Sequence, residues 1–262
     1  MIRALYTAAT GLQAQQFNTD VIANNIANAN TPGFKRDRIN FQDLLYQTFR
    51  RAGQSTLSGS MVPSSLRVGH GVRPISTQKI FLVGAAQQTG NPLDMMINGD
   101  GFFQVTMADG SAAFTRDGGF KVDASGNMVT SDGLLIEPAI TIPADATRVD
   151  VATDGTVSVL IGADNTLSQV GQIQLVRFQN PAGLEAVGQN LFKQTDASGD
   201  PVSGSPGEEG FGQIAQGFIE MSNVSIVDEL VNLIVAQRAF ETNSRAVSVA
   251  DQLLSIANNL GR

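Results

Sequence analysis

The two ends of the chain carry a similar hydrophobic pattern, in which apolar residues recur at helical intervals. Residues 223–260 contain neither Gly nor Pro, and their apolar residues repeat every seven positions. Seven residues make two turns of a slightly underwound helix, so the repeat predicts one helix of about 35 residues with a continuous apolar stripe. Ser225 followed by Asp228 predicts a capped start. The stripe consists of Ile226, Leu233, Phe240, Val247 and Leu254, and Leu230, Ile234, Leu253 and Ile256 widen it.

Residues 3–28 form a second helical pattern with an apolar stripe of its own. Leu5, Leu12 and Ile26 lie on a seven-residue grid, and Ile22 lies beside it. A helix roughly 50 Å long, as expected for residues 223–260, cannot cover its own stripe. It can pack on its own domain, on another segment of the chain, or on another subunit. The simplest arrangement pairs the two ends as a coiled coil, and the residues between them then form an insertion.

The pattern changes to β between about residues 76 and 220. Residues 77–83 and 101–107 alternate apolar and polar, and residues 170–178 continue this theme. Closely spaced Asp-Gly and Ser-Gly pairs are typical of short strands joined by tight hairpins. No parallel βαβ alternation occurs, so we expect a mainly antiparallel insertion and an α+β fold. The predicted turns are Asp109-Gly110, Asp117-Gly118, Ser125-Gly126, Asp132-Gly133 and Asp154-Gly155.

These patterns divide the chain into four parts. We expect an N-terminal helix in residues 1–30, a connector in residues 31–75, a β-rich outer domain in residues 76–220 and a C-terminal helix in residues 221–262. Residues 34–75 are predicted to be irregular, with a short helix or strand in residues 41–48. Residues 195–212 are rich in Gly, Ser and Pro, which predicts a flexible surface connection.

Composition narrows the classes of function. The net charge of −7 and the absence of a basic tract argue against a nucleic-acid partner. No run of 18 apolar residues is present, so no direct membrane span is expected. Charged residues make up only 16% of the chain, and a weakly charged surface suits repeated subunit contacts. The chain has no Cys and its N-terminus lacks the pattern of a cleaved signal peptide, which fits export of an unfolded chain by another route.

The residues needed for catalysis or metal binding are scarce. The single His, His70, lies between Gly69 and Gly71, and a Gly-flanked loop is a poor holder for a catalytic triad. One His without Cys argues against zinc, and the Asp-Gly pairs lack the spacing of a calcium loop. We therefore expect no enzyme activity, cofactor or metal.

The passage that follows the first helix carries a recognisable signature. Thr-Pro-Gly ends a helix, because Pro disfavours helical geometry before it and Gly accepts a positive φ. The whole string ANNIANANTPGFKR (residues 23–36) resembles the N-terminal signature of the rod and hook family, the axial proteins of the bacterial flagellum. Residues 98–105 and 113–133 resemble central motifs of that family, and residues 217–254 resemble its C-terminal region. The signature residues are Asn24, Asn25, Asn28, Thr31, Gly33, Phe34 and Lys35.

This resemblance implies a structural protein that assembles helically with its own copies. Residues 41–50, the Ser- and Gly-rich insert and residues 68–74 most resemble the distal rod members of the family, the drive shaft that transmits motor torque to the hook for swimming or swarming motility. The insert, residues 47–63, is associated there with a straight, stiff shaft. We expect the paired helices to form an inner tube whose subunit interface includes Leu5, Leu12, Ile22, Ile26, Ile226, Leu230, Leu233, Phe240, Val247 and Leu254.

The resemblance also implies partners and a location. Expected partners are proximal rod proteins, hook and hook-side proteins, the surrounding P- and L-ring proteins and the flagellar type III export apparatus. The expected location is the basal-body rod where it crosses the periplasm, reached without a cleaved signal peptide. Two alternatives stay open: a proximal rod or hook protein of the same family, and a soluble coiled-coil and β protein that acts as an adhesin-like binding module.

Overall fold

The chain folds into two compact units that it enters alternately. The computed structural model describes residues 2–54, 61–162 and 166–260. The helical unit comprises Met1–Ile26, Asp37–Gln78 and Ser225–Arg262, and the β unit comprises Ala27–Arg36 and Lys79–Val224. The chain therefore passes between the units four times, after residues 26, 36, 78 and 224. The helices at both ends and the mainly antiparallel middle confirm the predicted α+β fold.

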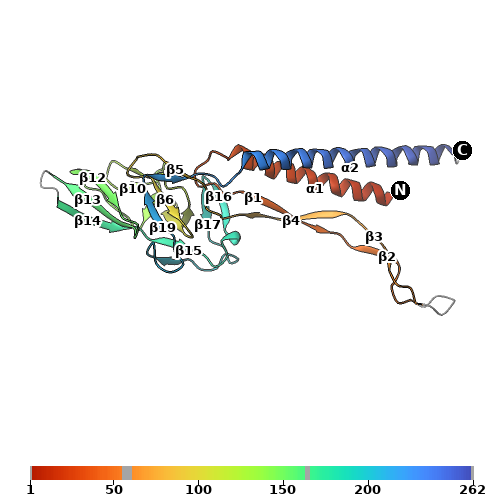
Figure 1. Ribbon diagram of the computed structural model, residues 1–262, viewed down its shortest axis with the longest axis horizontal. Coiled ribbons are helices and arrows are strands. Elements are labelled where there is room, and N and C mark those ends of the chain that lie inside the picture. The colour runs from red at the N-terminus through yellow and green to blue at the C-terminus, as the bar shows by residue number, and fades with distance from the viewer. Residues whose placement is uncertain (1, 55–60, 163–165, 261–262) are drawn as a thin grey trace. The chain divides into compact units, whose positions relative to one another are not determined.

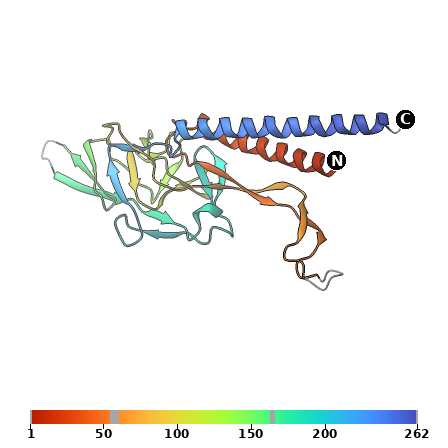
Figure 2. The same ribbon diagram turned by 45° about the vertical axis from the view of Figure 1, so that its right-hand side comes forward.

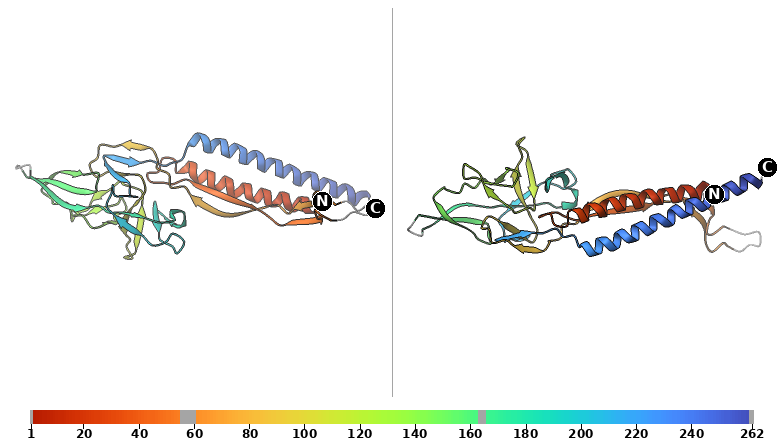
Figure 3. Two further views of the ribbon diagram at one scale, coloured as in Figure 1. Left: turned by 60° about the horizontal axis from the view of Figure 1, so that its bottom comes forward. Right: turned by 90° about the horizontal axis from the view of Figure 1, so that it is seen from above.

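Two long helices dominate the helical unit. Helix α1 spans Ile2–Ala27 and helix α2 spans Ile226–Leu260, close to the predicted bounds. The Asp228 amide donates to the Ser225 hydroxyl at 3.4 Å, as the capping signal predicts. The helices lie side by side, with the chain ends toward the same end of this unit (Figure 1, Figure 3). A Cβ at Gly11 of α1 would lie 2.9 Å from the Asn243 side chain of α2, so Gly permits their close approach. Neither helix is long and apolar enough to cross a membrane in the part of the chain described.

The segment predicted to be irregular between residues 34 and 75 is instead a β ribbon of the helical unit (Figure 2). Strand β1 (Asp37–Asp43) pairs with β4 (Val72–Lys79), and β2 (Tyr46–Arg50) pairs antiparallel with β3 (Leu66–Gly69). The prediction allowed a short strand in residues 41–48, where parts of β1 and β2 lie. The rest of it was wrong because most of these side chains are exposed, so no apolar alternation marks the strands. Residues 55–60, inside the predicted 47–63 insert, lie outside the described residues.

The β unit is built mainly around a sheet of nine strands. Seven run in the order β16 (Glu185–Gly188), β17 (Leu191–Lys193), β8 (Ala112–Thr115), β7 (Phe102–Thr106), β11 (Leu135–Glu137), β10 (Met128–Val129) and β9 (Lys121–Val122). Strand β15 (Leu175–Arg177) pairs with β7 and with β18 (Val202–Gly204). A 3₁₀ helix, Pro181–Gly183, precedes β16.

Three smaller sheets complete the β unit. Strands β12 (Ala146–Val151), β13 (Thr156–Ile161) and β14 (Thr166–Gln172) form a three-stranded sheet. Strand β6 (Met95–Asn98) pairs with β19 (Gln213–Gln216), and β5 (Ala86–Gln88) pairs with β20 (Phe218–Glu220). The strand pairs with a described register are all antiparallel.

Strand β7 separates two apolar cores, because successive side chains of a strand point to opposite faces. Phe103 belongs to a large core with Met95, Ile97 and Phe120. Its neighbour Phe102 belongs to a second core, which also contains the following aromatic and aliphatic side chains: Phe114, Val176, Phe178 and Phe192. Edge-to-face rings occur in both cores, for example Phe103–Phe120 with centroids 5.0 Å apart.

Most of the predicted turns are present. Gly110, Gly126, Gly133 and Gly155 have positive φ, as tight turns of this kind require. The turn predicted at Asp117-Gly118 was wrong: a Cβ at Gly118 would overlap the Met95 carbonyl oxygen, so Gly is needed there for close approach between chain segments. Two other predictions were too coarse. Residues 170–178 divide into β14 and β15, and residues 195–212 contain strand β18 and the buried Ser198.

The hairpin between β16 and β17 carries backbone strain. Gln189 has φ 54° in a turn where Gly is favoured, and its side chain is exposed. Gln189→Gly should relieve this strain and raise the free energy of unfolding by about 0.5–1 kcal/mol. Gln189→Ala keeps the Cβ and should change stability little. Urea denaturation of both variants checks the comparison, and equal stabilisation by Ala and Gly would contradict the explanation.

Candidate functional site

The signature after α1 begins with side-chain caps. In the helical unit, the side-chain amide of Asn25 donates to the Asp37 carbonyl oxygen at 2.8 Å, and the backbone amide of Asp37 donates to the Asn25 side-chain oxygen at 2.9 Å. In the β unit, the Thr31 amide and hydroxyl both donate to Asn28 at 3.2 Å. Asn25 is buried although it is polar, because its amide group is hydrogen-bonded on both sides. These residues terminate α1 and turn the chain.

The geometry in the centre of this turn requires Gly at position 33. Its φ is +70°, and a Cβ would lie 2.6 Å from the backbone nitrogen of Asp117 and 2.8 Å from the carbonyl carbon of Arg116. Its amide donates to the Glu220 carbonyl oxygen at 2.8 Å. Gly33 therefore meets two requirements at once, a left-handed backbone and close contact with another segment. Beside it, the Lys79 ammonium lies 4.9 Å from the centroid of the Phe34 ring.

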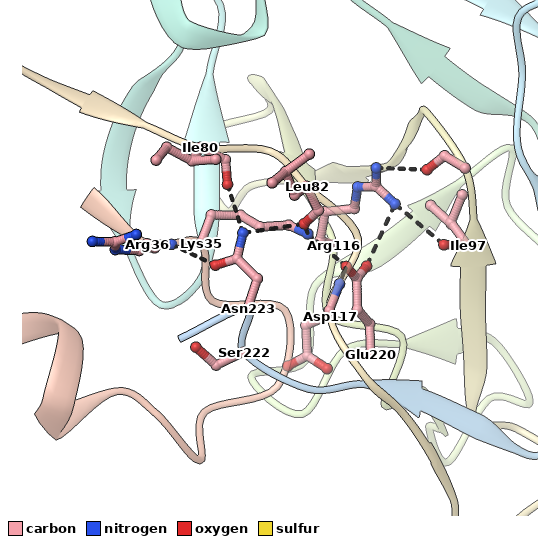
Figure 4. A network of polar contacts seen from close by, with 12 residues as sticks. Lys35, Arg36, Ile80, Leu82, Ile97, Arg116, Asp117, Glu220, Ser222 and Asn223 are labelled. Atoms are coloured by element: carbon pink, nitrogen blue, oxygen red, sulfur yellow. Dashed lines mark hydrogen bonds and ion pairs between the residues drawn. The ribbon is translucent and has the colours of Figure 1, made fainter. Parts of the chain in front are cut away.

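Three charged side chains meet in the interior of the β unit (Figure 4). Lys35 Nζ lies 2.5 Å from Glu220 Oε1, and Arg116 Nη1 lies 3.4 Å from Glu220 Oε2. The side chains are 0%, 1% and 0% exposed for Lys35, Arg116 and Glu220. We call these three residues the buried charge cluster. Charged groups are rarely buried so completely, and removing one partner of a buried ion pair typically costs about 3–5 kcal/mol.

Backbone groups from several segments add hydrogen bonds to the buried charge cluster, although Arg116 Nε is buried without a hydrogen-bond partner among the described residues. Lys35 also donates to the Leu82 carbonyl oxygen at 2.6 Å, and the Gly84 amide donates to Glu220 Oε1 at 2.8 Å. Arg116 donates to the carbonyl oxygens of Ile97 at 3.3 Å and Gly99 at 2.8 Å. Each charge is thus bonded by dipoles as well as by an opposite charge, which is what makes burial tolerable.

Asn223 extends this polar network to the next segments. Its side-chain amide donates to the carbonyl oxygens of Ile80 at 2.7 Å and Leu82 at 3.2 Å. Its side-chain oxygen accepts from the Arg36 amide at 2.8 Å. Asn223 therefore bridges residue 36 and residues 80–82, just before the chain enters α2 (Figure 4).

Burial changes the proton affinity of the two cations. Removal from water lowers the pKa of Lys35, the Glu220 carboxylate opposes this, and the nearby Arg116 charge adds to the lowering. Removal from water likewise lowers the pKa of Arg116, and the Glu220 and Asp100 carboxylates oppose it. Glu220 is the one carboxylate that forms ion pairs with both cations within the described residues.

The residues predicted to form the subunit interface fall into three groups of exposure. Ile22 is buried, Leu5, Leu12, Ile26, Leu233, Val247 and Leu254 are half-buried, and Ile226, Leu230 and Phe240 are exposed. The fully buried apolar residues of α2 are instead Ala236 and Ala250. The exposed side of α2 also carries large apolar side chains that the seven-residue repeat does not include: Val227, Val231, Val235 and Val249.

Matches to protein families cover just over half of the chain. Residues 5–35 match the model of the flagella basal body rod protein, residues 96–159 match the D1 domain of the flagellar hook proteins FlgE/F/G, and residues 215–260 match the C-terminal region of the flagellar basal body rod FlgEFG proteins. The fold and these matches define an axial protein of the flagellar rod and hook class.

Relatives with full-length similarity narrow the class. The chain is 48% identical to the flagellar basal-body rod protein FlgG of Borreliella burgdorferi, over 100% of both chains. It is 48% identical to FlgG of Caulobacter vibrioides, over 99% of both chains, and 39% identical to FlgG of Bacillus subtilis, over 100% of both. The chain belongs to the FlgG family of flagellar basal-body rod proteins. This is a family of structural proteins, not of enzymes.

Sequence reasoning identified Lys35 but missed its partners. Arg116 and Glu220 both lie in segments that resemble family motifs, yet neither was recognised as a buried charge. The signal for Glu220 is an acidic residue enclosed by apolar neighbours, Phe218, Ile219 and Met221. Arg116 lacks such a signal, because its neighbours Thr115 and Asp117 are polar.

The environment of Gly33 predicts a specific cost of substitution. Gly33→Ala should lower the free energy of unfolding by more than about 2 kcal/mol, because strain from positive φ adds to a backbone clash. Gly110 provides a matched control: its φ is +80°, but nothing lies within 4 Å of the position that a Cβ would occupy. Gly110→Ala should cost about 1 kcal/mol, from backbone strain alone. Chemical denaturation measures both; equal costs would contradict the role of close approach.

Asp117 predicts a pH dependence. Burial raises the pKa of Asp117 above its ordinary value of 3.8, and the hydrogen bond from the Gly119 amide opposes this. Between 3.8 and the raised pKa the folded state binds more protons, so this group stabilises the fold as pH falls through that window. Asp117→Asn does not titrate. Its stability relative to the unaltered protein should therefore be greater at pH 7 than at about pH 3.5, and denaturation at both pH values checks this. A pH-independent difference would be contrary to expectation.

Proposed function

We propose that this protein is a structural subunit of the distal rod of the bacterial flagellum, the shaft that transmits motor torque to the hook. Membership of the FlgG family and the similarity along the whole chain support this assignment. The similarity to another protein of the class is lower: the flagellar hook-basal body complex protein FlhP of Bacillus subtilis is 29% identical.

The observation that carries the mechanism is the exposed apolar face of α2. Val227, Leu230, Val231, Ile234 and Val235 lie within three turns of the helix, and each is at least 45% exposed. A soluble protein rarely exposes so many neighbouring large apolar side chains unless they form an interface. The buried face of α2 contains Ala236 and Ala250, which add little apolar area. The helices thus keep much of their apolar surface for contacts outside the chain.

We infer that other copies of this chain cover that face. The two helices pair as a coiled coil, and neighbouring subunits pack against them to form an inner tube. A groove of about 480 Å³ beside the exposed Phe240 offers a place for a side chain of a neighbouring helix. A heterologous contact that repeats by rotation and translation produces a helical filament. Many such contacts together make a shaft stiff enough to transmit torque.

Other parts of the proposal rest on the family alone. The family assembles with other rod and hook components, and we extend this to proximal rod proteins, hook-side proteins and the P- and L-ring proteins. We place the protein in the rod where it crosses the periplasm, after export by the flagellar type III apparatus. The β ribbon, whose strand β2 includes the start of the 47–63 insert, is the segment we assign to keeping the shaft straight. The alternative from another class, an adhesin-like binding module, is not supported, because the chain belongs to the FlgG family of rod proteins.

The exposed face of α2 provides the test. The double variant Val231→Glu, Val235→Glu should fold with nearly unchanged stability, because both side chains are exposed in the single chain. In cells it should abolish the distal rod and motility, since buried unpaired charges oppose helix packing. Electron microscopy of basal bodies and a motility assay measure these effects.

Leu167 of β14 offers a matched control for that test. It is 67% exposed, so Leu167→Glu makes the same chemical change on the β unit. This variant should retain a distal rod and motility. Normal rods in the α2 double variant would refute assembly through this face of the helix.

A further inference from the structure

The buried charge cluster gathers the segments by which the chain enters and leaves the β unit. Lys35 lies just before the crossing after residue 36, and Leu82 lies just after the crossing at residue 78. Glu220 lies shortly before the crossing after residue 224. All of these residues belong to the β unit. The cluster therefore fastens three connecting segments, residues 28–36, 79–84 and 220–224, to one another.

The charge balance of the cluster makes Glu220 indispensable to it. Two cations share one carboxylate, and one Glu220 oxygen also accepts the Gly84 amide at 2.8 Å. Without the Glu220 charge, Lys35 would be buried beside Arg116 with no carboxylate paired to it, whereas the Asp100 carboxylate still acts on Arg116. Repulsion and desolvation would then expel the more flexible cation. Lys35 is that cation, because Arg116 is held by two carbonyl groups of another segment and lies over the Phe102 ring.

The connecting segments can loosen without dismantling the large apolar core. Residues 28–36 contain no strand, and β5 and β20 form a two-stranded sheet of their own. The large core that contains Phe103 includes no residue of the three segments. The second core does make contact with them, because the Phe81 ring packs edge to face on Phe102 and Phe192, with centroids 5.3 Å apart. Local opening that leaves the large core intact costs less free energy than global unfolding.

We propose that the buried charge cluster is a lock, closed by the Glu220 carboxylate, that holds the three connecting segments on the β unit and opens as one unit while the large apolar core stays folded. In the assembled shaft, a role that rests on the proposed function, the closed lock would transmit load between these segments and the β sheets. The segments are positioned by Lys35, Arg116 and Asn223, and they stay together only while the Glu220 charge is present.

Reactivity of lysine amines reports the state of the lock directly. The chain has four lysines, and Lys121 and Lys193 are exposed, so they serve as internal references. The full-length protein and its Glu220→Gln variant are treated with an acylating ester, and peptide mass spectrometry gives the acylation rate of each lysine. Amide hydrogen exchange in β7 shows whether the core stays folded. We expect the acylation of Lys35 to rise about tenfold or more in the variant, with the protection of β7 unchanged.

Two further variants separate the lock from general destabilisation. Glu137→Gln is the matched control, because Glu137 is an exposed carboxylate that accepts hydrogen bonds from Gln104 and Thr106; it should leave Lys35 unreactive. Lys35→Met leaves one cation and one anion, so the Gly84 amide should stay protected. An unreactive Lys35 in the Glu220→Gln variant would overturn the proposal. So would loss of protection at Lys35 and β7 together, since that is global unfolding.

Hydrogen exchange of the unaltered protein keeps the proposal testable if Glu220→Gln does not fold. The Gly33 and Gly84 amides donate to the backbone and side chain of Glu220, so both report the lock. They should share one protection factor, lower than that of β7. Protection equal to that of β7 would refute independent opening. These measurements use the isolated protein, so a failure of rod assembly would not affect them.

Discussion

The Glu220 carboxylate is the interaction on which the arrangement of this chain depends. It meets Lys35 across 185 positions of sequence, and Arg116 joins from the middle of the chain. Burying three charges costs several kcal/mol per ion, and carbonyl and amide groups of neighbouring segments offset this cost with hydrogen bonds to the three side chains. The requirement for those partners restricts the paths of the segments. The connections of the β unit are therefore specified by polar geometry, while its sheets are specified by apolar packing.

The two helices follow a different rule. Their most buried residues in the single chain are mainly small or polar, such as Ala8, Ala14 and Ala250, so the pair gains little from burying apolar area. Many of their large apolar side chains are exposed in the single chain. The β unit, with aromatic cores and many strand pairings, supplies most of the stability of the subunit. In the proposed assembly, the helices gain theirs from neighbouring subunits. Folding and assembly thus use separate surfaces of one chain.

Sequence patterns predicted the features that depend on periodicity. The repeat from Ile226 to Leu254 predicted the length of α2 nearly to the residue, and the Asp-Gly and Ser-Gly pairs located four turns. The ribbon of residues 37–79 was missed because its exposed strands lack alternation. The turn at Asp117-Gly118 was mistaken because a Gly needed for close contact looks the same as a Gly needed for positive φ. The partners of Lys35 lie too far along the chain for any local pattern to reveal.

The signature string after α1 can now be interpreted in physical terms. Asn25, Gly33 and Lys35 are all buried, and each contacts other segments of the same chain. The Asn25 side chain is hydrogen-bonded to the Asp37 backbone, Gly33 allows the backbone of Asp117 to approach closely, and Lys35 forms an ion pair with Glu220. A residue used in this way tolerates few substitutions, because its replacement leaves a partner unsatisfied or creates a clash. An exposed Val or Leu on a helix has several adequate replacements. The signature after α1 is therefore a part of the sequence that folds the subunit, whereas the helix surface that we propose assembles the shaft can accept more substitutions.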